Sequence, residues 1–360
     1  MLLCLGPRTA GHAFAQDSVP RIPLVTGLTL SSVFHSPLGE REDLLEVTSA
    51  DARGVHYAWH ERTISPKGDT TTGFRKRFVG AGDLAGAPRF DSVFGPEEVE
   101  RPGFTAVSVS SAVYRQLRDT GTAPYSLMKY PSSSTEAESP FAAFAAQPIR
   151  YKGNLTRASG PEPFPLLVNG RRAVVPALHL RGNFADGLRR AEWELWVLAD
   201  SAHALLLKSV LQREVFQMVR ADLPAERPAV GGGAAAGDEE RELAKRCRME
   251  LPGVYFAFGT AAIDPISDRA LAQLADVLKH HPEWTFTVEG HTDSIGTSAA
   301  NQALSQRRAE AVRARLRERH AVDTHTWRVA GYGASRPRES NATIEGRARN
   351  RRVELVRDCR

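Results

Sequence analysis

The sequence predicts an α+β protein with two domains, the first mainly antiparallel β and the second a β-α-β-α-β-β sandwich. Residues 17–224 contain short runs of alternating apolar and polar residues separated by turn residues, which is typical of strands with one buried face. After residue 238, such runs alternate with stretches of helical spacing. Between them, residues 225–237 are rich in glycine and alanine and have too little bulky apolar surface to pack. We therefore expect a linker at 225–237 and a second domain at 238–360.

Length and charge exclude some classes of protein. The 360 residues leave room for two domains, and a content of 42% hydrophobic and 25% charged residues is ordinary for globular proteins. No run approaches the roughly 18 apolar residues of a membrane-spanning helix, so we expect none. The net charge is +5, but the arginines from Arg307 onward alternate with Glu310 and Glu318 and do not cluster with aromatic residues. We read them as a solvated helix face and expect no nucleic-acid partner.

Residues 1–16 have features of an export signal. The segment begins with apolar Met1-Leu2-Leu3-Cys4-Leu5 and ends in Ala13-Phe14-Ala15-Gln16, which has the small-residue spacing of a signal-peptidase site. The basic n-region is missing, which indicates a start codon assigned too late or a frayed tail; we favour a truncated signal peptide. Cleavage after Ala15 would remove Cys4 and leave Cys247 and Cys359, an even pair in a compartment that permits oxidation.

The first domain carries strand, hairpin and loop signals. Residues 55–59 alternate with period two, and Asn169-Gly170 between two apolar runs indicates a tight hairpin, because both residues tolerate positive φ. Helical spacing at 109–117 predicts one short helix, and 131–140 reads as a serine-rich surface loop. His56 and His60 have ligand spacing on one strand face. They lack a third histidine or acidic partner nearby, so we read them as surface side chains and expect no metal or cofactor.

The second domain begins with a predicted helix at Asp238-Glu239-Glu240-Arg241. The acidic residues come at its N-terminus, where the helix dipole stabilises negative charge. The alternation of apolar residues at 254–258 predicts a strand. A helix is expected after it, with Asp264 as its N-cap and Pro265 in its first turn, and Pro282 ends this helix. Its apolar face is formed by Leu271, Leu274, Ala275 and Leu278. Further strands are expected at 285–291, 327–331 and 350–356, with a long helix from about Ser298, so that helices cover one face of a mixed sheet.

Two charged residues stand out in this domain. Asp293 follows the strand at 285–291, where Gly290 lets the backbone turn sharply. Leu304, Arg308 and Val312 form one stripe of the long helix, so a guanidinium interrupts an apolar face. Burying an arginine without a partner is costly, so its guanidinium is expected to pair with an acidic residue of the protein or with the anionic group of a bound ligand.

Three motifs follow one another here. They are Gly290-His291-Thr292-Asp293, then Asn301 with Leu304-Ser305 and Arg308-Ala309, and then Gly346-Arg347-Ala348 with Asn350-Arg351-Arg352-Val353-Glu354. In these motifs, over roughly residues 250–357, the sequence resembles the OmpA-like peptidoglycan-binding domain. The resemblance implies non-covalent binding of peptidoglycan. In that family the aspartate meets the ammonium group, and the arginine the carboxylate, of diaminopimelate in the stem peptide.

The resemblance also implies which residues form the pocket. Asp293 and Arg308 would hold the zwitterion by charge-assisted hydrogen bonds. The residues that would line or support the pocket are His291, Thr292, Asn301, Leu304, Asn350 and Arg352. One departure is that Ala257 follows Phe256 where the family often has an aspartate, so one ligand contact is missing. The competing interpretation is that Asp293 and Arg308 simply pair with each other.

The implied protein is a periplasmic anchor that joins an exported β-domain to the cell wall and associates with the outer membrane. The β-domain would meet an outer-membrane or other envelope protein. A cell-wall hydrolase is one alternative, but the sequence has no GxSxG motif and no paired glutamates suited to glycan cleavage, so we expect no enzyme. The other alternative is a periplasmic carrier or scaffold in which the N-terminal sheet binds lipid or protein.

Cys247 and Cys359 are expected to form a disulfide. They bracket the second domain, and its last strand should end beside its first helix.

Overall fold

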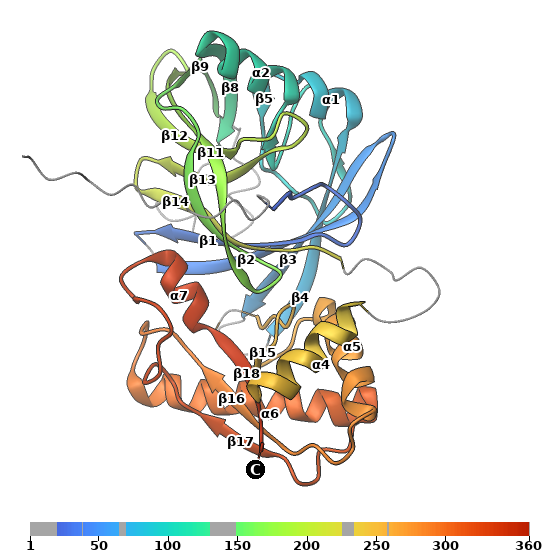
Figure 1. Ribbon diagram of the computed structural model, residues 1–360. Helices are drawn as coiled ribbons and strands as arrows, with labels where there is room; N and C mark the ends of the chain where they lie inside the picture. Colours follow the sequence, from blue (N-terminus) through green and yellow to red (C-terminus); the bar gives the residue numbers. More distant parts are fainter. Residues whose placement is uncertain are drawn as a thin grey trace, which may run out of the picture.

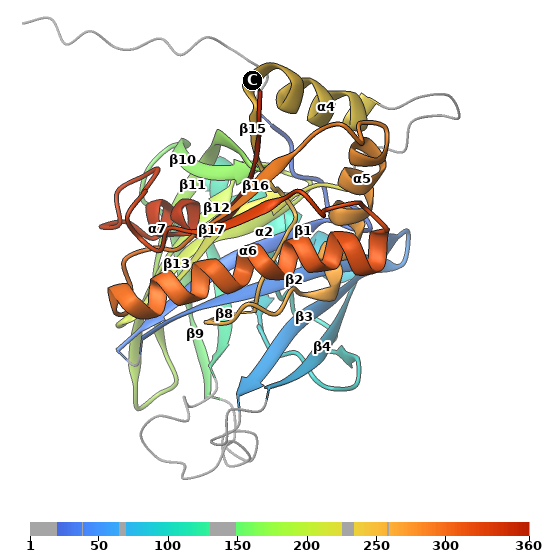
Figure 2. The same ribbon diagram turned by 90° about the horizontal axis from the view of Figure 1, so that it is seen from below.

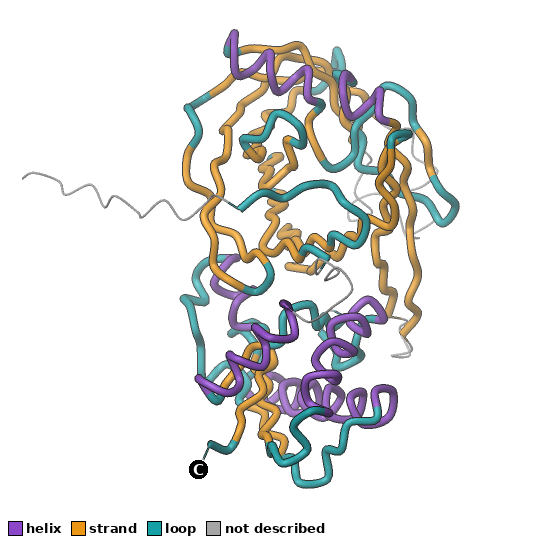
Figure 3. The backbone as a smooth tube through the Cα atoms, turned by 45° about the vertical axis from the view of Figure 1, so that its right-hand side comes forward, coloured by secondary structure: helices purple, strands orange, loops and turns teal. Residues whose placement is uncertain are grey.

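Figure 1 shows a computed structural model that describes residues 20–37, 39–64, 70–129, 149–224, 234–257 and 259–359. The expected signal segment 1–16, the serine-rich loop 131–140 and most of the expected linker, residues 225–233, lie outside the described residues. Strands make up most of the first domain, whereas helices gather around a smaller sheet in the second (Figure 3).

The first domain is built on one large, mainly antiparallel sheet. Its strands pair in the order β5-β8-β9-β11-β12-β13-β14-β1-β2-β3-β4-β6, with β10 and β7 pairing beside this path. Among the described strands of the first domain, only β4–β6, β5–β8 and β10–β14 pair in parallel. The strands are β1 (Thr29–Ser36), β2 (Gly39–Asp51), β3 (Gly54–Ile64), β4 (Thr70–Gly80), β5 (Arg89–Phe90), β6 (Val99–Glu100), β7 (Ser108–Val109), β8 (Thr122–Lys129), β9 (Ile149–Arg157), β10 (Glu162–Val168), β11 (Arg171–Ala185), β12 (Arg190–Leu198), β13 (Ala204–Leu211) and β14 (Glu214–Asp222).

The hairpin and helix signals in this domain are confirmed. Asn169 and Gly170 both have positive φ, 49° and 72°, and join β10 to β11 in a tight hairpin. The expected helix is α2 (Ser111–Thr120), capped by the Ser110 side chain, while a second short helix, α1 (Ala81–Gly86), was not expected. Two apolar clusters fill the domain, one around Leu28 and one around Leu117.

The second domain has a four-stranded mixed sheet in the order β15-β18-β16-β17. Strand β16 pairs in parallel with β17 and antiparallel with β18. Its elements are α4 (Ala234–Arg246), β15 (Arg248–Glu250), the 3₁₀ helix η1 (Pro265–Ser267), α5 (Asp268–Lys279), β16 (Phe286–His291), α6 (Ser298–His320), β17 (Arg328–Gly331), α7 (Ile344–Asn350) and β18 (Arg352–Arg357). The long helix α6 runs across the domain (Figure 2).

The sheet separates an apolar face from a charged face. Phe286, Val288, Val353 and Leu355 join the apolar residues of α5 and α6 in one core, so both helices cover the same face. Gly290 allows α6 to pack closely against β16, because a Cβ at this position would lie 2.0 Å from the backbone oxygen of Ser305.

Three expectations for this domain were wrong. Residues 254–257 form no strand, and Phe256 makes only an isolated bridge with Ile263; the edge of the sheet is β15 instead. Phe258 lies outside the described residues. Helix α7 was missed because its sequence has no apolar periodicity; Thr343 caps it by accepting from the Gly346 backbone. Ala234 to Gly237, expected in the linker, belong to α4.

The predicted disulfide between Cys247 and Cys359 is present, with 6.0 Å between the two Cα atoms. It joins the end of α4 to the residues after β18, so it closes almost the whole second domain into a loop. No helix in the described part of the chain combines the length and apolar character needed to cross a membrane.

The two domains lie against each other, with α7 beside β1 and β14 (Figure 1). Val33 and Val219 of the first domain contact Ala348 of α7. Arg220 pairs with Glu250 at 3.2 Å, and the Tyr255 hydroxyl donates to Asp222. These contacts bring β1 and β14, which lie in the middle of the strand order, against the second domain.

Candidate functional site

The loop after β16 holds Asp293 in a fixed position. Its Oδ1 accepts a hydrogen bond from the Ile295 backbone at 2.9 Å, and its backbone oxygen accepts one from the Asn301 side chain at 3.2 Å. Thr292 ties the same loop to Gly333 through its backbone N–H at 3.0 Å. Asn301 and Thr292 therefore support the loop, and Asp293 is left only 6% exposed.

Arg308 lies in the middle of α6 and is only 5% exposed. Its Nε donates to the backbone oxygen of Thr260 at 2.9 Å, and its Cζ lies 5.0 Å from the centre of the Phe256 ring. Burial lowers the pKa of Arg308 to about 10, with Glu42 opposing that effect. Among the described residues, no carboxylate lies within ion-pair distance of this guanidinium. It is a buried cation with unused donors.

Asp293 does not pair with Arg308, so the competing interpretation of a simple ion pair between them was wrong. The Oδ2 of Asp293 accepts instead from Nη1 of Arg351 at 2.5 Å. Arg351 is 9% exposed at its side chain, and it also contacts Glu40 and Glu42 of the first domain.

Sequence reasoning named Arg352 and missed Arg351. The Arg352 side chain points elsewhere, with its Nε 2.5 Å from Oε1 of Glu354. Adjacent residues entering a strand point to opposite sides, so only one of the two arginines can reach Asp293. The motif alone did not indicate which one, although the alternation of β18 was a usable signal.

Asn350 and Leu304 occupy different positions around the site. The Asn350 side chain is fully buried and donates to Oδ1 of Asn341 at 2.9 Å, and that same oxygen accepts from the Ser294 backbone at 3.2 Å. Asn350 thus supports the loop beside Asp293 from behind. Leu304 is half-buried on α6, one turn before Arg308.

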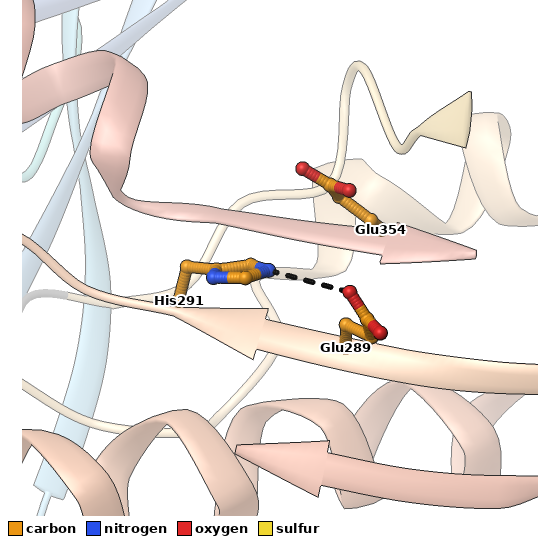
Figure 4. A group of neighbouring side chains, drawn as sticks. All are labelled: Glu289, His291 and Glu354. Carbon is orange, nitrogen blue, oxygen red and sulfur yellow. Dashed lines mark ion pairs between the residues drawn. The ribbon is translucent and has the colours of Figure 1, made fainter. Parts of the chain in front are cut away.

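His291 lies on the charged face of the sheet with Glu289 and Glu354 (Figure 4). Ligand atoms of these three side chains come within 4.8 Å of one another, which is a spacing that a metal ion could use. However, Arg248 pairs with both glutamates, and Arg338 pairs with Glu354 at 3.0 Å. A cation would have to displace these guanidinium groups, so the chemistry of the group fits an ion-pair cluster better than a metal site.

The electrostatics of His291 agree with that interpretation. Burial and the nearby Arg352 lower the pKa of His291 to about 4, so the imidazole is neutral at physiological pH. Its ring stacks against Tyr332 with 5.4 Å between the ring centres. Neither ring nitrogen has a hydrogen-bond partner among the described residues. His291 is therefore placed against the sheet, away from Arg308.

His56 and His60, interpreted above as surface side chains without an acidic partner, have separate carboxylate partners, and for His60, whose side chain is only 7% exposed, the surface interpretation was wrong. His56 Nδ1 lies 2.7 Å from Glu98, and His60 Nδ1 lies 3.1 Å from Asp264 of the second domain. Although burial lowers it, hydrogen bonds with Asp264 and Glu46 raise the pKa of His60 to about 9. His60 is thus a charged contact between the domains.

A cavity of about 320 Å³ lies between the two domains. Arg308, Arg351, Phe256 and Ala257 line it from the second domain, so the position where an aspartate was missed does face this space. From the first domain it is lined by Ser31, Arg41, Glu42, Asp43, Leu44, Trp59, His60, Leu167, Val219 and Arg220.

The second domain matches a known family. Residues 255–351 match the OmpA family. The chain is similar to outer membrane porin F of Pseudomonas aeruginosa (44% identity over 133 residues, 37% of this chain and 36% of that protein). It is also similar to the probable lipoprotein YiaD of Escherichia coli (40% over 109 residues, 30% and 49%) and to the peptidoglycan-binding protein ArfA of Mycobacterium tuberculosis (42% over 108 residues, 29% and 33%).

Among solved structures, the peptidoglycan-associated lipoprotein from Burkholderia pseudomallei is 35% identical and aligns with 29% of this chain and 88% of its own, with a TM-score of 0.27. The chain spans between about a third and a half of the length of the curated relatives it matches. Residues 255–351 are an OmpA family domain.

Proposed function

With an OmpA family domain at residues 255–351 as the premise, we propose that this chain binds peptidoglycan non-covalently and so anchors its β-domain to the cell wall. The ligand group is the diaminopimelate side chain of the stem peptide. Asp293 takes its ammonium group and Arg308 its carboxylate. The protein acts in the periplasm, at the wall and close to the outer membrane, and it binds without catalysis.

One observation carries this proposal: Arg308 is 5% exposed, faces a cavity and has no carboxylate partner among the described residues. A buried cation without a counter-ion is costly, and an anion that arrives with a ligand removes that cost. A planar carboxylate can accept two parallel hydrogen bonds from a guanidinium, which fits the unused donors of Arg308.

Asp293 is the proposed partner of the ligand's positive charge, its ammonium group. This residue is 6% exposed, and its carboxylate accepts a hydrogen bond from Arg351. An incoming ammonium group can take the place of that guanidinium. A side chain that carries both charges then satisfies Asp293 and Arg308 together, whereas a simple anion satisfies only Arg308.

The test is sedimentation of the protein with purified sacculi of two kinds. One wall carries diaminopimelate at the third position of the stem peptide, and the other carries lysine, which has the ammonium group but no side-chain carboxylate. We expect clearly stronger binding to the first. Equal binding to both walls would refute the role of Arg308, and release of soluble muropeptides would instead indicate a hydrolase.

A further inference from the structure

Strand β2 of the β-domain carries carboxylates to the edge of the pocket. Glu40 and Glu42 are two residues apart on this strand, so their side chains point to the same side. The side chain of Glu40 is only 4% exposed, although no sequence pattern marks it as buried. Both residues face α7 of the second domain.

Helix α7 supplies the matching cations. Arg347 lies within the helix, and Arg351 is the residue at its C-terminal cap. Arg347 donates from Nη2 to Glu40, and its Nε lies 3.3 Å from the other oxygen of that carboxylate. Arg351 donates from Nε to Glu42 at 2.5 Å. Val33 and Val219 of the first domain also form an apolar contact with Ala348 of α7 at this interface.

Arg351 connects this contact to the pocket. Its Nη1 donates to Asp293 at 2.5 Å and lies 3.4 Å from Glu40, so one guanidinium bridges the pocket acid and strand β2. Glu42 also lines the cavity beside Arg308 and favours the charged form of that arginine. The carboxylates of β2 therefore hold the Arg351 guanidinium against Asp293, where the ammonium group of a ligand would bind.

We propose that strand β2 is an internal competitor for the peptidoglycan pocket, and that the chain binds the wall only after the β-domain has moved away from α7. This inference rests on the function proposed above. The ammonium group of a ligand and Arg351 require the same carboxylate oxygen of Asp293. A stem peptide joined to a glycan strand also needs a path into a cavity that β2 and β3 cover in this structure. Docking of the β-domain and binding of peptidoglycan are then mutually exclusive.

Two full-length variants test the competition from opposite sides. Glu40→Gln with Glu42→Gln keeps the shape of β2 and removes its charges. Gly170→Cys with Pro252→Cys joins the domains by a disulfide, since a Cβ at Gly170 would lie 2.9 Å from the Cβ of Pro252 and a small shift allows a bridge. The matched control is Glu192→Gln, an exposed glutamate on β12 of the same domain.

The probe is the soluble tripeptide L-alanyl-D-glutamyl-meso-diaminopimelate, and the measurement is its dissociation constant. Because the affinity scales with the fraction of open molecules, we expect the glutamine variant to bind about tenfold more tightly or better, and the control to match wild type. The oxidised cysteine variant should bind at least about tenfold more weakly. Its affinity should return on reduction, with wild type reduced in parallel because it carries its own disulfide.

The outcomes separate this inference from the proposed function. Wild-type affinity in both the glutamine variant and the verified cross-linked variant would overturn the competition. Adding Asp293→Ala to the glutamine variant examines the pocket itself. If that addition leaves tripeptide binding unchanged, the proposed function fails as well; if it weakens binding while β2 has no influence, only the competition fails.

Discussion

Replacing Arg308 by alanine tests the binding proposal most directly. The side chain is buried in α6, and its one fixed hydrogen bond, from Nε to Thr260, leaves the terminal nitrogens for a ligand. A hydrogen bond to a charged group contributes about 1.5–3 kcal/mol. Losing one such bond weakens binding roughly ten- to a hundredfold. We expect Arg308→Ala to reduce binding to diaminopimelate-containing sacculi by this factor.

The structure also predicts how Arg308→Ala affects folding. Arg308 has no carboxylate partner among the described residues, and burial already lowers its pKa to about 10. Removing such a cation relieves a desolvation cost while losing the bond to Thr260 and the contact with Phe256. The two effects oppose each other, so the thermal transition should stay close to that of wild type.

Arg307 provides the matched control. It is the neighbouring residue on the same helix, carries the same charge and is exposed. If the wall is held by a shaped pocket, Arg307→Ala should bind sacculi almost like wild type, because surface charges contribute little and are screened by salt. Arg308→Lys should be intermediate, because lysine keeps the charge and loses the planar fork. Equal losses for Arg307→Ala and Arg308→Ala in a sedimentation assay would refute the pocket.

Three further predictions concern stability, measured by urea unfolding. The pKa of His291 is about 4 in the folded chain and about 6.5 when unfolded, so the free energy of unfolding should fall by up to about 3 kcal/mol as the pH drops from 6.5 to 4. His291→Gln should make the free energy of unfolding less dependent on pH in this range, and an unchanged pH dependence in the variant would contradict the prediction. Replacing Cys247 and Cys359 by serine should lower the free energy of unfolding by about 2–4 kcal/mol, and a wild-type value would show that the bridge contributes nothing. Gly290→Ala should cost about 1–3 kcal/mol, because its Cβ would lie 2.0 Å from the Ser305 oxygen and α6 must shift; unchanged stability would refute that close approach.

Elements with a strong period or a strong turn signal could be predicted from the sequence. The alternation into β16, the apolar stripe of α6 and the Asn169-Gly170 hairpin are all present in the structure. Helix α7 could not be predicted in this way, because it is short and rich in arginine, so its apolar contact through Ala348 depends on the other domain.

The candidate site was predictable only in part, for a related reason. Asp293 and Arg308 belong to motifs whose local geometry is fixed by β16 and α6, and both side chains are buried. Arg351 and Glu42 are different, because their roles depend on pairing between residues about 300 positions apart. In the sequence, Glu42 is one acidic residue in an alternating strand, and such residues usually face water. Tertiary contacts alone reveal its partner.

The charges at the domain interface show what separation of the domains would change. With β2 in place, the carboxylates of Glu40, Glu42 and Asp293 pair with the guanidinium groups of Arg347 and Arg351. Together with Arg308, which lines the adjoining cavity, these three acids and three arginines sum to a net charge close to zero. Without β2, the second domain would expose three cations and one acid. Such a face attracts the carboxylate-rich stem peptides of the wall, and the attraction acts over about a Debye length, ~8 Å at physiological salt. Opening would thus free the pocket for the zwitterion and create the field that draws the peptide in, so the same two glutamates govern both access and attraction.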